Sequence, residues 1–223
     1  MKFLFRALPV SALLLAAACS SAGTSIQTTG RFRAEVWADN WFAFSLGEQA
    51  IAEDSVPITT ERSFNKEVFG FDGQYPLVLN FTAKDYKADD TGLEYIGTPM
   101  QQMGDGGFIA QITDTTTGKV IAVSSAAWKC LVVHRAPLDV SCEKSTTPEV
   151  DCKAQITPEP TGWKSATFDT SSWPAALEYS AAAVGVKDGY NEVVWDASAK
   201  LIWSASLKQD NTLLCKATVA APS

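Results

Sequence analysis

The chain has 223 residues, of which 46% are hydrophobic and 19% are charged, and its mean hydropathy is +0.00. This composition excludes extended disorder and a multi-span membrane protein. The 25 acidic residues outnumber the 18 basic ones, and a pI near 4.7 offers no basic surface for nucleic acid. The single histidine, His134, argues against histidine-rich metal centres.

Residues 1–18 have the pattern of a secretory signal peptide. Lys2 and Arg6 form its positive region, and residues 8–15 form an apolar stretch that is too short to cross a bilayer. The pattern predicts an exported protein.

The sequence LAAAC at residues 15–19 resembles the bacterial lipobox, in which the cysteine is acylated. The resemblance implies that Cys19 is lipidated, whereas cleavage by an ordinary signal peptidase after Ala18 or Ala22 is the alternative. Residues 19–29 then form a flexible tether. We expect an outer-membrane lipoprotein of the cell envelope that faces the periplasm or the exterior. Its acidic body touches the membrane only through the lipid.

From residue 31 onward, apolar and polar residues alternate with a period of two, which predicts strands with one buried face. The turn-rich segment 114–118, between residues 108–113 and 119–123, predicts a hairpin. No segment has a long helical period. Residues 30–221 are therefore predicted to form one all-β domain, an antiparallel sandwich that is a monomer. The side chains predicted to face inward are Phe32, Ala34, Val36, Ala38, Leu77, Leu79, Phe81, Ala83, Phe108, Ala110, Ile112, Leu213, Cys215, Ala217 and Val219.

Four cysteines remain besides Cys19, an even number that predicts two disulfides in an exported chain. Three pairings are open. We expect Cys142–Cys152 to close a loop rich in Ser, Thr and Pro, and Cys130–Cys215 to join two apolar strands. The stretch at about 137–161 is predicted to be an insertion in the domain.

Three stretches resemble the galactose-binding-like (discoidin-type) jelly rolls: residues 36–47 (VWADNWFAFSLG), residues 126–129 (AAWK) and residues 162–176 (GWKSATFDTSSWPAA). The resemblance implies a jelly-roll topology and a ligand site in the loops at one end of the sandwich. It also implies carbohydrate, or another small ligand, as the partner, with calcium as a possible ion.

Six residues are the ligand-binding candidates in such end loops: Asp39, Asn40, Trp41, Asp85, Glu94 and Asp105. An exposed tryptophan can stack on the apolar face of a sugar ring, and carboxylates and amides can bind its hydroxyls. The acidic loop 84–97 adds Asp89 and Asp90, whose oxygens could bind calcium with Asp85 and Glu94. A solvated acidic turn is the alternative for this loop.

The sequence predicts a protein that is not an enzyme, because it has no motif typical of a catalytic nucleophile, a metalloprotease or a phosphate-binding loop. An alternative function is copper handling, since Met100 and Met103 are soft ligands that could join His134. A structural envelope module without a small ligand is a further alternative.

Overall fold

A computed structural model describes residues 29–60, 63–85 and 89–222. The predicted signal peptide and Cys19 lie outside the described residues. Most of the described chain forms two six-stranded antiparallel sheets, so the prediction of an all-β antiparallel sandwich is confirmed. The jelly-roll topology stays a prediction. Among the described residues, no helix has the length and apolar content that a membrane crossing needs.

The first sheet has the order β12-β13-β8-β1-β4, with β9 paired to β8. Its strands are β1 (Thr29–Asp39), β4 (Lys66–Gln74), β8 (Gly107–Asp114), β9 (Lys119–Val123), β12 (Leu177–Tyr179) and β13 (Leu201–Trp203). The predicted hairpin is present as β8–β9, and Gly118 in its turn has a φ of 69°.

The second sheet has the order β11-β10-β14-β5-β2-β3. Its strands are β2 (Trp41–Leu46), β3 (Gln49–Glu53), β5 (Leu77–Lys84), β10 (Lys129–Arg135), β11 (Gln155–Ile156) and β14 (Asp210–Val219). The short strands β6 (Leu93–Glu94) and β7 (Gln102–Met103) pair separately. The helical turns are η1 (Val140–Lys144), α1 (Pro148–Asp151), α2 (Ala181–Val184) and η2 (Tyr190–Glu192).

The core lies between the sheets and is rich in aromatic rings. Phe81 of β5 packs against Phe44 of β2 at 4.6 Å between ring centroids, and against Phe108 of β8 at 4.9 Å. Trp128 lies 5.4 Å from Phe81. The side chains that the alternation predicted to face inward all belong to this core, with Ala217 and Val219 only partly buried. These contacts between facing sheets set how the strand ends are aligned.

A strap, residues 157–173, covers the outer face of the second sheet. Lys216 of β14 donates from Nζ to the carbonyl oxygens of Trp163 at 3.0 Å and Ser165 at 2.7 Å. Asn80 of β5 donates from Nδ2 to the carbonyl oxygen of Lys164 at 3.0 Å. The strap explains why β5 is buried on both faces although two of its outward residues, Asn80 and Thr82, are polar.

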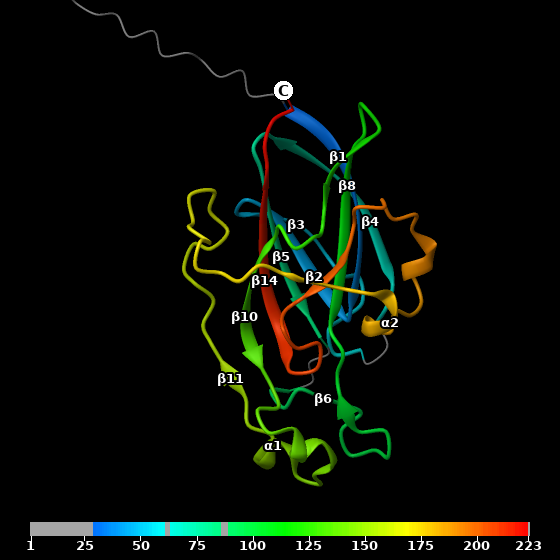
Figure 1. The fold of residues 1–223 in the computed structure, drawn as a ribbon, viewed down its shortest axis with the longest axis vertical. Helices are drawn as coiled ribbons and strands as arrows, with labels where there is room; N and C mark the ends of the chain where they lie inside the picture. The colour runs from blue at the N-terminus through cyan, green and yellow to red at the C-terminus, as the bar shows by residue number, and fades with distance from the viewer. Residues whose placement is uncertain (1–28, 61–62, 86–88, 223) are drawn as a thin grey trace, which may run out of the picture.

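Both predicted disulfides are present, Cys130–Cys215 between β10 and β14 and Cys142–Cys152 between η1 and the end of α1. The first joins paired strands, because Cys130 and Cys215 are cross-strand neighbours. The second closes a loop near the end of the molecule where α1 and β6 lie, opposite the start of β1 (Figure 1).

Removal of each disulfide should cost a different amount of stability. In the chain-entropy model, a bridge over 85 residues stabilises by about 4.6 kcal/mol, and one over 10 residues by about 2.7 kcal/mol. We expect Cys130→Ala/Cys215→Ala to lower the free energy of unfolding in urea by more than Cys142→Ala/Cys152→Ala does. An equal or reversed order would contradict the assignment of the larger constraint to the first bridge.

Candidate functional site

Several strand ends meet at one end of the sandwich, the lower end in Figure 1. Backbone hydrogen bonds join the segments there: Asn40 donates to the carbonyl of Lys84 at 2.9 Å, and Asp85 donates to the carbonyl of Asn211 at 3.0 Å. Gly106 donates to the carbonyl of Leu207 at 2.7 Å. The loops that follow these strands are therefore held close together.

The six predicted ligand-binding residues all lie at or near this end, but most of them are not on the surface. Asp39, Asn40, Asp85 and Glu94 are buried, with exposed fractions of 5% or less. Only Trp41 and Asp105 are partly exposed. The assignment of these residues to a ligand site stays a prediction.

Lys187 connects two of the predicted carboxylates. Its Nζ lies 3.4 Å from Oδ2 of Asp39 and 3.5 Å from Oδ1 of Asp105. Glu94 also acts on both Asp39 and Lys187 through its charge. No pattern in the sequence points to Lys187, because it lies 148 residues from Asp39 along the chain. We call Asp39, Glu94, Asp105 and Lys187 the charged cluster.

Burial dominates the electrostatics of the charged cluster. It raises the pKa of Asp39 well above its ordinary value, and the Lys187 ammonium opposes this only in part. Burial also raises the pKa of Asp105, against the charges of Lys187 and Lys208. For Lys187, burial lowers the pKa, but Asp39 and Asp105 outweigh it, so the pKa is raised overall. The cluster thus fastens the segment around Lys187 to the ends of the strands.

The glycines at 104, 106 and 107 allow close packing at this end. A Cβ atom at Gly104 would collide with the carboxylate of Asp85, and one at Gly106 would collide with the ring of Trp203. The segment that precedes β8 is therefore held tightly against its neighbours, as close approach of the backbone requires glycine here.

Most of the tryptophan side chains are buried in the interior of the protein. Five of the seven are buried with exposed fractions of 5% or less: Trp37, Trp128, Trp163, Trp173 and Trp203. Trp195 is partly buried and donates from Nε1 to the carbonyl of Tyr190. Trp41 is partly exposed, with Nζ of Lys84 4.9 Å from its ring centroid. Of the sequence-predicted site residues, Trp41 is the one whose ring could stack on a ligand.

The residues proposed for copper lie in different surroundings. Met100 is 61% exposed, whereas Met103 packs beside Leu93 and the Cys142–Cys152 disulfide. His134 is buried, with Nε2 3.2 Å from the carbonyl oxygen of Asp90.

The acidic loop has local partners of its own. Oδ1 of Asp89 accepts hydrogen bonds from the backbone and hydroxyl of Thr91. Across residues 29–60, 63–85 and 89–222, no three His, Cys, Asp or Glu side chains are grouped so as to hold a metal ion.

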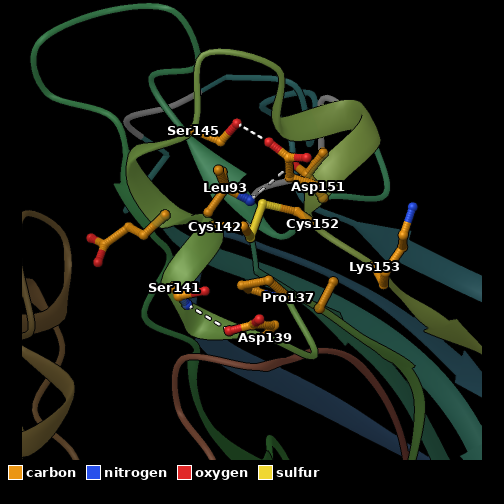
Figure 2. Close-up of a disulfide and its surroundings, with 12 residues drawn as sticks. Leu93, Pro137, Asp139, Ser141, Cys142, Ser145, Asp151, Cys152 and Lys153 are labelled. Carbon is orange, nitrogen blue, oxygen red and sulfur yellow. Dashed lines mark hydrogen bonds between the residues drawn. A yellow bond between two sulfur atoms is a disulfide. The ribbon is translucent and has the colours of Figure 1, made fainter.

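Beyond the charged cluster lies a small lobe built around a disulfide, which we define as residues 89–103 and 137–156 and call the disulfide lobe. Its interior consists of Leu93 and the Cys142–Cys152 bridge, with Ile96 and Met103 beside them. Figure 2 shows Leu93 next to the bridge, with η1 and α1 on either side. This interior is too small to order the lobe by apolar burial alone, so hydrogen bonds matter here.

Gln101 joins the two halves of the disulfide lobe. Its buried side chain donates from Nε2 to the carbonyls of Glu143 at 2.9 Å and Ser145 at 2.8 Å, and it accepts from the backbone of Gly97 at 2.8 Å. Nζ of Lys144 donates to the carbonyl of Gln101. The loop between β6 and β7 is thus fixed against η1.

The disulfide lobe has an open hollow of about 780 Å³ on its surface. It is lined by Asp139, Ser141, Cys142, Lys144, Ser145, Thr146, Val150, Asp151 and Lys153. Two hydrogen bonds shape the wall: Asp139 accepts from the backbone of Ser141 at 2.9 Å, and Ser145 donates to Asp151 at 2.5 Å (Figure 2). Hydroxyl, carboxylate and ammonium groups therefore surround one hollow, a residue set that the sequence did not single out.

Comparisons with protein-family models, with curated proteins and with solved structures give no match to this chain. The resemblance to galactose-binding-like domains stays a prediction.

Replacement of Lys187 by methionine tests the charged cluster. At pH 8 we expect Lys187→Met to lower the free energy of unfolding by about 1–3 kcal/mol, because Asp39 is left buried without its cation. The loss should be smaller at pH 5. Burial raises the pKa of Asp39 in the folded protein. The Asp39 carboxyl therefore stabilises the fold fully in acid, where it is protonated and needs no cation, and this stabilisation is lost as the pH rises through the raised pKa.

Urea unfolding at both pH values measures this effect. The matched control is Lys119→Met, which removes an exposed lysine of the β8–β9 hairpin. A loss that is equal at pH 5 and pH 8 would show that Asp39 does not carry the effect.

Proposed function

We propose that this chain is an exported, non-catalytic binding protein that recognises carbohydrate through the disulfide lobe. The observation that carries the proposal is the open hollow of about 780 Å³ in that lobe, whose volume lies in the range of small-ligand sites. The ligand contacts are therefore assigned to residues 139–153 rather than to the buried carboxylates of the charged cluster.

The chemistry of the lining supports a polyhydroxylated ligand. Sugar hydroxyls donate and accept hydrogen bonds, and the lining offers both roles. Ser141, Ser145 and Thr146 carry hydroxyls, and the same surface holds two carboxylates and two ammonium groups. No aromatic side chain of the described residues lines this hollow. Recognition there would consequently depend on hydrogen bonds, with Val150 as the apolar contact.

The disulfide lobe is also preorganised for binding. The Cys142–Cys152 bridge, the Gln101 hydrogen bonds and the contact between Ser145 and Asp151 fix the loops before a ligand arrives. Loops that are already ordered lose little entropy on binding, which favours affinity.

The orientation of the molecule fits a tethered protein. The chain enters β1 at the end of the sandwich opposite α1 and β6 (Figure 1). A lipid on Cys19, if it anchors the protein to an outer membrane of the cell envelope, would therefore hold the body by the end remote from the hollow. The disulfide lobe would then face the periplasm or the exterior.

A second candidate function is contact with a protein partner, as expected for a structural envelope module. Of the nine large apolar side chains that the described residues expose, five belong to the disulfide lobe: Met100, Leu138, Val140, Val150 and Ile156. Exposed apolar groups gathered on one part of a surface are typical of interaction sites.

A glycan array tests the carbohydrate proposal, with a soluble form that begins after Cys19. We expect binding to at least one glycan, and Thr146→Trp should weaken it at least tenfold, because the indole occupies the hollow. Isothermal titration with the best glycan gives the affinities.

The matched control is Thr116→Trp, in the exposed turn of the β8–β9 hairpin, which should leave the affinity unchanged. A blank array contradicts the carbohydrate proposal and favours the protein partner. Equal weakening by both tryptophan variants would mean that the hollow is not the site.

A further inference from the structure

A second hollow, of about 320 Å³, lies on the side of the sandwich between β10 of one sheet and β12–β13 of the other. None of the residues that line it belongs to the disulfide lobe. The lining of this hollow includes Val132, Arg135, Leu177, Ser204, Ala205 and Asp210.

The wall of this side hollow is mainly apolar. Val132, Pro174 and Ala175 contribute carbon surface, and Leu177 of β12 is 48% exposed beside them. An apolar side chain that is partly exposed to water gains free energy when a ligand buries it. A ligand with an apolar body that covers Leu177 would recover part of that free energy.

Three polar residues converge in the same hollow. Asp210 has no solvent exposure, and its carboxylate accepts from Nε of Arg135 at 2.5 Å, from the hydroxyl of Ser204 at 2.6 Å and from the backbone of Ser206 at 3.3 Å. Both carboxylate oxygens of Asp210 are therefore engaged within the protein. The buried carboxylate holds the guanidinium in place by one edge.

The guanidinium of Arg135 keeps unused donors. Nε is bonded to Asp210, whereas the two terminal amino groups have no acceptor among the residues that the structure describes. The Arg135 side chain is 44% exposed, so these groups are within reach of a ligand. A guanidinium fork with free N–H groups matches the geometry of a carboxylate.

We propose that the side hollow binds a small amphipathic carboxylate, a molecule with an apolar body and one carboxylate group. The apolar body would lie against Val132 and Leu177, and the carboxylate would accept hydrogen bonds from the terminal amino groups of Arg135. Arg135 also lines a neighbouring hollow of about 230 Å³ with Gln155 and Thr157, so a variant must distinguish the two.

Three probes separate the parts of this recognition: octanoate, octanol, which has the same chain without the charge, and acetate, which has the charge without the chain. Isothermal titration of the disulfide-bonded protein should show octanoate binding at least tenfold more tightly than either of the others. Equal affinity for octanoate and octanol would overturn the assignment of Arg135, and equal affinity for octanoate and acetate would overturn the apolar wall.

Variants locate the site. Ala205 is exposed and lines only the larger of these two hollows, so Ala205→Trp should weaken octanoate binding at least tenfold. Ala220→Trp, at an exposed residue after β14, is the matched control and should have no effect. Unchanged affinity in Ala205→Trp would overturn the proposal.

Arg135→Gln should also abolish the preference for octanoate over octanol, but it leaves Asp210 buried without its cation. Its fold is therefore checked by near-ultraviolet circular dichroism, and Arg31→Gln, at an exposed arginine of β1, is its control. A folded Arg135→Gln variant that keeps the preference would overturn the role of the guanidinium. The glycan array is independent of these results, because none of these variants replaces a residue that lines the hollow of the disulfide lobe.

Discussion

The contact between the two sheets through their aromatic rings is the constraint on which the other features depend. Phe81 projects from one sheet and meets Phe108 of the other at 4.9 Å between ring centroids, with Trp128 beside both. A shift of one strand by a single residue would turn these rings outward, so the register is strongly fixed. Because the register is fixed, Asp39, Lys84 and Asp210 all reach the same end of the sandwich, where the loops that carry the candidate site begin.

The charged cluster and the disulfide lobe share one residue, Glu94, and are coupled through it. Glu94 belongs to β6 in the lobe, yet its charge acts on Asp39 at the end of β1 and on Lys187. Gln102 of β7 donates to the same carboxylate at 3.1 Å. The lobe is thus coupled to the sandwich through the carboxylates of Glu94 and Asp39, which are both buried. Such groups are stabilising only when each has its partner, which ties the order of the lobe to the integrity of the sandwich.

Much of the fold could be predicted from the sequence, because alternation is a local signal. Phe32, Ala34 and Val36 are buried as the pattern indicates, and the β8–β9 hairpin follows from its turn residues. Both cysteine pairs were also expected. The candidate site was less accessible to prediction. Asp39 and Glu94 look like surface carboxylates in the sequence, but they are buried because distant segments cover them, and Lys187 is close only in the folded chain. The hollow of the disulfide lobe arises from turns whose shape depends on Gln101, a residue type with no distinctive pattern.

The register also brings the two ends of the described chain together. Thr29, the first residue of β1, is opposite Gln74 at the end of β4, and Val219, the last residue of β14, is opposite Leu77 at the start of β5. Only Tyr75 and Pro76 separate Gln74 from Leu77, so both chain ends flank the same tight connection. A short peptide could join them, and the chain could be reopened at the exposed turn around Gly118 without cutting a strand that lies inside either sheet. The architecture is therefore compatible with circular permutation. The spatial order of the strands in each sheet does not depend on the order in which they are synthesised.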